Sequence, residues 1–313
     1  MRNPLAAIER YQSPLVRDLA WALLSPALLN SSNGNHNPSP RWYLEAFLLI
    51  ESHLESLDRD DAPLQHHLTA LPNHRLGLYF ERLWSYWLMH NGRYELLAHN
   101  LQVIEDHQTL GEFDFIVRDT HADQIEHWEL AVKFYLGIPP LREASHWFGT
   151  NSRDRLDLKY CHLVDKQLTL SETFPGRRVC QAQGWNINQR RLISKGRLYY
   201  PYTGRGITTS DMPRSVDPGH LTGFWLSQSA FLQQAAQIPD ARFHRLDRTE
   251  WLAHHTNTLQ PLASIQDFLE QQLHPRPLQF RVSGWQAEPF RLFVVPDTWQ
   301  ADALATLSNT GQQ

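Results

Sequence analysis

Apolar residues recur every three to four positions in the N-terminal part of the chain, which is the spacing of an amphipathic helix. This pattern predicts helices at 13–29 and 41–57, with a polar loop containing Pro and Gly at 30–40 between them. A third helix is predicted at 75–90, where an Asn-Gly pair ends the pattern. The chain is therefore expected to begin as a helical segment.

The period of the pattern then changes to two, as in a strand with one buried face. Three such runs occur at 94–104, 113–117 and 125–136, and the connections between them are short and polar. Short polar connections favour hairpins between consecutive strands. The three runs therefore predict an antiparallel meander.

The remainder of the chain mixes both periods. Helical spacing returns at 154–168, and we expect strands at 179–185 and 196–200. In the C-terminal part, the pattern predicts a helix at 262–273 and strands at 279–282 and 291–295. The whole pattern predicts an α/β protein with an N-terminal helical segment, a central core, and a C-terminal α+β extension packed on that core, at 1–74, 75–210 and 211–313.

Composition narrows the class of protein. Apolar residues make up 42% and charged residues 20% of the 313 residues, the ordinary mixture of a globular protein. No run approaches the roughly 20 apolar residues of a membrane helix, so we expect no membrane partner. Only two cysteines occur, Cys161 and Cys180, which excludes a disulfide framework and a four-cysteine zinc site. We therefore expect a cytoplasmic protein.

Charge is unevenly distributed along the chain. The formal net charge of −4 argues against a nucleic-acid partner. Between Arg142 and Arg205, however, twelve basic and five acidic residues leave a local charge of +7. Such a surplus is typical of a nucleic-acid contact and, equally, of a solvated basic surface.

Two of the predicted strands carry charged residues on one face. Side chains two positions apart share a face of a strand, which groups Glu112 with Asp114, and Glu129 with Ala131 and Lys133. The opposite face of the third strand is wholly apolar and is expected to be the buried one. Hairpin register would bring Asp114 beside Glu129 or Lys133, where two carboxylates can hold Mg²⁺ or Mn²⁺. The alternative is an exposed face with cross-strand ion pairs.

These residues resemble a known family. Gly111-Glu112-Phe113-Asp114, followed on the next strand by an acid and a lysine, resembles the motifs of the PD-(D/E)XK nuclease superfamily. The runs ELAVKFYLG and RDRLDLK are similar to a bacterial family of unknown function that is grouped with these nucleases. The resemblance covers about residues 75–200. It implies an α-β-β-β-α-β core and metal-dependent hydrolysis of DNA or RNA.

The resemblance also implies roles for particular residues. Asp114 and Glu129 would bind the metal, and Lys133 would assist the attacking water or stabilise charge on the phosphate. Glu81, on the helix that precedes the meander, corresponds to a glutamate that often joins the site. Gln167 corresponds to a glutamine found on the helix after the meander in many members.

Basic residues follow the proposed site along the chain. Arg153, Arg155 and Lys159 are expected on the helix at 154–168, where they would hold a phosphate backbone or form a solvated basic face. Glu112 is an auxiliary candidate for the metal site.

One position departs from the pattern of the superfamily. Ala131 stands where an acid usually precedes the lysine by two residues, and the acid is at Glu129, about 7 Å further along the strand. One alternative is therefore an inactive nuclease fold that binds nucleic acid or acts as a scaffold. Another is a helical interaction protein with tryptophan-rich surfaces in residues 1–90.

Overall fold

The computed structural model describes residues 4–30, 36–69, 75–203, 207, 211–255, 258–270 and 276–309. The fold is mixed α/β, as predicted, and the chain divides into two compact units. The first unit comprises Met1–Val132, Tyr160–Lys195 and Leu252–His254. The second comprises Lys133–Lys159, Gly196–Trp251 and His255–Gln313. The three consecutive segments expected from the sequence remain a prediction.

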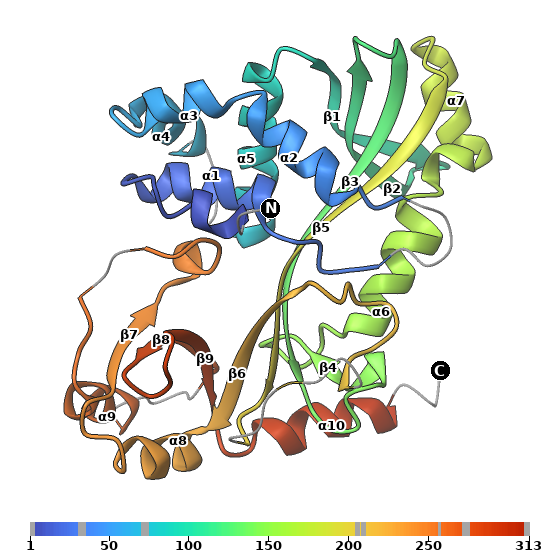
Figure 1. Ribbon diagram of the computed structural model, residues 1–313. Helices are drawn as coiled ribbons and strands as arrows, with labels where there is room; N and C mark the ends of the chain where they lie inside the picture. Colours follow the sequence, from blue (N-terminus) through green and yellow to red (C-terminus); the bar gives the residue numbers. More distant parts are fainter. Residues whose placement is uncertain are drawn as a thin grey trace. The chain divides into compact units, whose positions relative to one another are not determined.

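The first unit begins with five helices (Figure 1). They are α1 Pro14–Leu24, α2 Pro40–Leu48, α3 Glu51–Leu57, α4 Ala62–Thr69 and α5 Leu76–His90, preceded by a 3₁₀ turn at Pro4–Ala7. The first and third predicted helices are thus confirmed, although α1 ends earlier than expected. Ser13 caps α1 by accepting a hydrogen bond from the Val16 amide, and a proline opens the helix.

The region between α1 and α5 differs from the prediction. The single helix expected at 41–57 is two helices, because Ile50 has a φ of −124° and leaves the helical conformation. Helix α4 was not predicted. Residues 31–35 of the predicted loop lie outside the described residues.

Four strands form the sheet of the first unit, in the order β1-β2-β3-β5. They are β1 Tyr94–Glu105, β2 Gln108–Asp119, β3 Gln124–Gly137 and β5 Ile187–Pro201. Of the last two strands, only the parts up to Val132 in β3 and up to Lys195 in β5 belong to the first unit. β1 pairs antiparallel with β2, and β2 pairs antiparallel with β3. The predicted meander is therefore confirmed.

One face of this sheet carries a cluster of aromatic side chains. Trp128 of β3 lies 5.4 Å from Trp42 and 6.1 Å from both Trp84 and Trp87, measured between ring centroids. Trp84 and Trp87 are fully buried. These tryptophans form the core between helices and sheet, so they do not form the exposed docking surface considered for residues 1–90.

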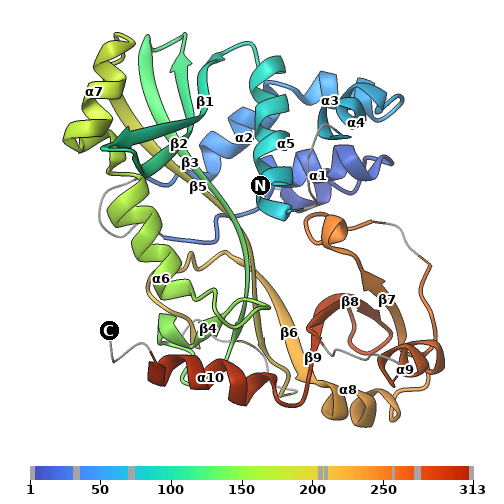
Figure 2. The same cartoon turned by 180° about the vertical axis from the view of Figure 1, so that it is seen from behind.

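The other face of the sheet is also covered. Helix α7 Phe174–Ala182 packs against β1, as Figures 1 and 2 show from two sides. A hydrophobic cluster joins the two layers and consists of Val103, Phe113, Ile116, Leu170 and Cys180. Because helices cover both faces, Glu129 is only 1% exposed. The alternative of an exposed face with cross-strand ion pairs is therefore wrong at Glu129.

The segment between β3 and β5 is helical for most of its length. α6 Leu156–Cys161 continues as a π-helical turn at His162–Gln167 and a 3₁₀ turn at Leu170–Glu172, which supports the helix predicted at 154–168. The strand predicted at 179–185 is wrong, because α7 occupies this region. Thr173 caps α7 through the Gly176 amide and a proline lies in its first turn, both strong helix-starting signals.

The second unit has the strand order β3-β5-β6-β9-β8-β7, with β4 Trp147–Phe148 paired to β3. The added strands are β6 Leu221–Ser227, β7 Arg242–Leu246, β8 Leu278–Ser283 and β9 Phe290–Val295. β6 runs parallel to β5 and β9, and the other two pairs are antiparallel.

The helices of the second unit pack on these strands or follow them. They are α8 Gln228–Ala235, α9 Leu262–Glu270 and α10 Trp299–Asn309, with 3₁₀ turns at Ala144–His146 and Arg248–Glu250. The predicted C-terminal helix and two strands are confirmed as far as the structure describes them, since residues 271–273 lie outside the described part. β6, α8, β7 and α10 were not predicted. None of the described helices is long and apolar enough to cross a membrane.

Candidate functional site

The candidate site of the first unit begins where β2 and β3 stop pairing. Phe115 opposite Trp128 is the last pair of this ladder in the direction of Asp114. One position further, the Leu130 amide donates a 2.8 Å hydrogen bond to the Asp114 carboxylate instead of to a backbone carbonyl. The half-buried Asp114 carboxylate therefore lies beside the Leu130 amide, and its predicted proximity to the Glu129 carboxylate stays a prediction.

Glu129 is held by side chains on either side of it. His127 Nε2 lies 2.7 Å from one carboxylate oxygen, and Gln167 Nε2 lies 3.4 Å from the other. Gln167 Nε2 is also 3.3 Å from the Glu112 carbonyl, which fixes the amide against β2. Gln167 therefore contacts the Glu129 carboxylate, and its predicted role in nucleic-acid binding stays a prediction.

Burial determines the charge state of His127. Its side chain is fully enclosed, and this desolvation, with a smaller contribution from the nearby charge of Arg190, lowers its pKa from 6.5 to about 3. The imidazole is therefore neutral at physiological pH, and its Nε2–H donates to Glu129. His127 thus orients the carboxylate without neutralising it, as outer-shell partners do in metal sites.

Glu81 and Glu112 are placed differently. Glu81 is half-buried on α5, the helix whose tryptophans pack on the Trp128 face of β3. Glu129 follows Trp128 directly and therefore points to the opposite face. Glu112 is half-buried on β2, two positions before Asp114. The participation of Glu81 and Glu112 in a metal site remains a prediction.

Lys133 belongs to the second unit. Its ammonium group lies 2.5 Å from the Asp154 carboxylate, which also accepts a 3.2 Å hydrogen bond from the Tyr135 hydroxyl. Burial and the Asp154 charge raise the pKa of Tyr135 well above its usual value, so it stays protonated. The role of Lys133 towards a phosphate or a water stays a prediction based on the resemblance.

The predicted phosphate-binding residues lie in different environments. Only Lys159 lies on α6, since Arg153 and Arg155 precede the helix; Arg153 is exposed, and Lys159 is half-buried. Arg155 is buried and forms a bidentate pair with Asp157, at 3.0 and 2.6 Å. A phosphate contact by Arg155 would therefore have to replace an existing ion pair, whereas Arg153 is accessible.

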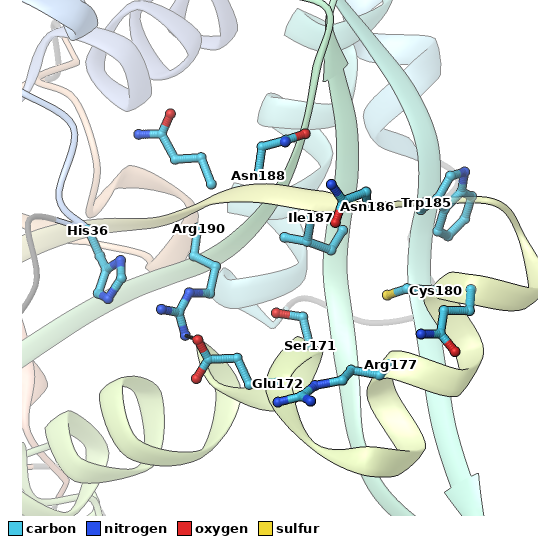
Figure 3. Close-up of a pocket in the computed structure, with 12 residues that line it drawn as sticks. His36, Ser171, Glu172, Arg177, Cys180, Trp185, Asn186, Ile187, Asn188 and Arg190 are labelled. Atoms are coloured by element: carbon cyan, nitrogen blue, oxygen red, sulfur yellow. Dashed lines mark ion pairs between the residues drawn. The ribbon is translucent and has the colours of Figure 1, made fainter.

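A polar cavity of about 520 Å³ in the first unit was missed by the sequence analysis (Figure 3). It lies between α7 and the start of β5, and its lining includes Glu172, Arg177, Trp185, Asn186, Asn188 and Arg190. The predicted strand at 179–185 concealed it, because that assignment placed Trp185 within a strand rather than after a helix. The Gly184-Trp185 step is the signal that marks a helix end.

Asp114 and Glu129 are the two carboxylates that the sequence predicts as ligands of a divalent cation. Within the described part of the chain, no group of three or more His, Cys, Asp and Glu side chains is arranged to hold a metal ion. Mg²⁺ needs fewer protein ligands, because it usually binds one or two carboxylates and completes its shell with waters and substrate phosphates. Asp114 and Glu129 supply this number of ligands, with only oxygen donors.

Comparison with known proteins places the chain in a family. No curated protein and no solved structure matches it. The family model that does match covers residues 17–295 and therefore includes residues of both compact units. The chain belongs to the family described as a domain of unknown function, DUF1853.

Proposed function

We propose that the protein is a metal-dependent nuclease that hydrolyses phosphodiester bonds of DNA or RNA, with Asp114 and Glu129 as ligands of Mg²⁺ or Mn²⁺. The observation that carries the proposal is the end of the β2–β3 ladder. There, the Asp114 side chain accepts a hydrogen bond from the amide of Leu130, the residue after Glu129. An ordinary hairpin has no need of a carboxylate at this point.

The surrounding residues suit this chemistry. A bound divalent cation would polarise the phosphodiester and lower the pKa of a water. His127 and Gln167 would hold the Glu129 carboxylate in one orientation, which limits the reorganisation needed when a ligand binds. Asp114 is held in the same way by the Leu130 amide.

A second candidate function is nucleic-acid binding without cleavage. Two observations favour it: Ala131 replaces the acid that usually precedes the lysine, and Glu129 is almost completely buried. A carboxylate that is enclosed in this way needs local opening before it can share a metal with a large substrate. The two candidate functions differ in whether the protein binds metal and cleaves nucleic acid.

The test measures Mn²⁺ binding by calorimetry and cleavage of labelled DNA and RNA in parallel. Asp114→Asn and Glu129→Gln keep the shape of the side chain and remove its charge. We expect each to abolish measurable Mn²⁺ binding and to lower cleavage by more than about 100-fold, beyond the loss typical of outer-shell partners. The matched control is Glu95→Gln, an exposed carboxylate on β1, which should behave as the wild type.

The outcomes separate the two candidate functions. Loss of both Mn²⁺ binding and cleavage in the two variants supports the nuclease. Metal binding by the wild type without cleavage of DNA or RNA supports a binding protein. If the wild type binds no metal at millimolar concentration, the nuclease proposal is wrong.

A further inference from the structure

The end of α7 builds one wall of the polar cavity. Gly184 adopts a φ of +69°, and its amide bonds to the Gln181 carbonyl at 3.0 Å, while the Trp185 amide bonds to the Cys180 carbonyl at 2.9 Å. This pair of bonds is the Schellman motif that ends many helices. It fixes the backbone of Trp185 at the point where the chain turns towards β5.

Trp185 is a rigid aromatic surface at this position. It is half-buried, with part of the side chain packed on the hydrophobic cluster under α7, and it also lines the cavity (Figure 3). An indole held from one side in this way loses little further freedom when a flat group stacks on it. Stacking on a preplaced aromatic ring is the usual way in which proteins bind bases of single strands.

The cavity also carries positive charge. Arg190 is held by Glu172 at 2.9 Å and by the Leu168 carbonyl at 3.3 Å, so its charge is already balanced. Arg177, an exposed residue in the middle of α7, adds a second guanidinium for which the described residues provide no ion pair. The lining therefore has a surplus positive charge that would attract a phosphate.

Amide side chains complete the lining between these groups. Asn186 precedes β5 and Asn188 is its second residue; both are exposed and are among the residues that line the cavity. The Asn188 side-chain oxygen accepts a 3.0 Å hydrogen bond from the Ile125 amide, which leaves its NH₂ group directed away from that bond. Amides both donate and accept, so they can pair with the polar edge of a base without selecting one base.

We infer that this cavity binds one nucleotide of a single-stranded nucleic acid, with the base on Trp185 and a flanking phosphate at Arg177. The inference rests on the proposed function and adds to it the strandedness of the substrate. A base in a duplex is stacked on both sides and cannot reach an indole inside a cavity. The volume of about 520 Å³ lies within the range of roughly 300–1,000 Å³ that is usual for small-molecule sites.

The test is fluorescence anisotropy with the full chain and a labelled oligothymidine of about twelve nucleotides, a length within the usual site sizes of single-strand binders. EDTA is present, so that cleavage cannot occur. We expect Trp185→Leu, which keeps apolar packing but removes the ring, to weaken binding at least about fivefold. Arg177→Ala should weaken binding and reduce the salt dependence by about one phosphate contact, a slope change of about 0.7.

Matched controls separate the cavity from general basic charge. Arg178→Ala removes an exposed arginine of the same helix that does not line the cavity, and it should bind as the wild type does. The same sequence as a duplex should bind more weakly than the single strand. Circular dichroism of each variant establishes that it is folded before binding is measured.

Several results would overturn the inference. They are absence of binding by the wild type, equal affinity of Trp185→Leu and wild type, or a free thymidine nucleotide binding as tightly as the oligonucleotide. These results are independent of the cleavage assay. If the oligonucleotide binds at the cavity but no metal-dependent cleavage is found, the cavity stands and the nuclease proposal fails. If cleavage depends on Asp114 but the cavity variants bind the oligonucleotide normally, the nuclease proposal stands and the cavity inference fails.

Discussion

Glu126 shows how single residues hold the first unit together. This carboxylate is 1% exposed and receives two hydrogen bonds from Arg191, at 2.5 and 2.8 Å, and one from Trp128 Nε1 at 2.7 Å. The Arg191 guanidinium also lies over the Trp42 ring, 5.2 Å from its centroid. The charge is thus buried together with all of the groups that compensate for its desolvation.

Removing Glu126 should therefore be costly. We expect Glu126→Ala to lower the free energy of unfolding by about 3–5 kcal/mol, because it leaves Arg191 as an uncompensated and mostly buried charge. Urea denaturation followed by tryptophan fluorescence measures this loss. The control is Glu45→Ala, whose partner Arg41 is 87% exposed, and which should change stability by less than about 1 kcal/mol. Equal effects of the two variants would contradict the prediction.

A buried histidine in the second unit should make stability depend on pH. Burial lowers the pKa of His220, whose Nδ1 lies 2.7 Å from the Asp217 carbonyl and whose Nε2 lies 2.9 Å from the Tyr200 hydroxyl. The folded state thus favours the neutral ring, while the unfolded chain takes up a proton below about pH 6.5. The contribution of His220 to the free energy of unfolding is therefore fully present above that pH and is lost as the pH falls.

The measurement compares urea denaturation of wild type and His220→Gln at pH 7 and pH 5. The free energy of unfolding of the wild type should fall more steeply between these pH values than that of the variant. Replacing the exposed His121 by glutamine should leave the wild-type pH dependence in place. A His220→Gln variant with the same pH dependence as the wild type would show that His220 does not contribute.

Side-chain alternation predicted which strand faces carry the candidate carboxylates but not what surrounds them. The contact of Asp114 with the Leu130 amide is consistent with hairpin register and the period of two, both local properties of the chain. The burial of Glu129 and the neutral state of His127 depend on Gln167 and on helices that pack from distant parts of the sequence. A pattern within one strand carries no information about what covers its second face.

At the scale of secondary-structure elements, errors occurred where the signals at helix ends outweighed the hydrophobic pattern. The region at 179–185 has apolar residues that fit a strand, yet Thr173 with the following proline starts a helix and Gly184 ends it. The long meander strands were predicted correctly, because each has a sustained period of two. The short elements β7 and α8 were not predicted from the hydrophobic pattern.

Gly196 determines how closely β5 approaches β3 in the second unit. Its φ is +144°, and a Cβ atom there would lie 1.7 Å from the Lys133 carbonyl oxygen. We therefore expect Gly196→Ala to lower the free energy of unfolding by more than about 3 kcal/mol, because both strain and a backbone clash must be relieved. Thermal unfolding followed by circular dichroism measures the effect.

The matched control is a glycine without neighbours. A Cβ atom at Gly77, on α5, would meet nothing within 4 Å. Gly77→Ala should raise stability by roughly 0.5–1 kcal/mol, because alanine favours the helix. Destabilisation by both substitutions to the same extent would contradict the steric explanation.

At the scale of the whole molecule, each compact unit is assembled from three separate stretches of chain. The short stretch Leu252–His254 joins the first unit through specific bonds. Arg17 donates to the His254 carbonyl at 3.0 Å, and the Ala253 amide donates to Asp18, also at 3.0 Å. The hydrophobic pattern could not predict this division, because neither unit is continuous in the sequence.

A fragment of residues 1–132 should therefore not fold alone. It lacks Arg191, the partner of Glu126, and the part of β5 that completes the sheet of the first unit. We expect the fragment to show no cooperative thermal transition by circular dichroism, whereas co-expression with 133–313 should restore one. Cooperative unfolding of the fragment alone would show that the first stretch suffices.

The interleaving of the two units has a consequence at the level of the gene. A recombination junction anywhere between codons 132 and 252 would separate stretches that must fold together. Neither unit can therefore be exchanged, duplicated or fused to another gene by a single crossover. Exchange of a whole unit therefore needs several junctions in the gene, because each unit consists of three stretches of the chain.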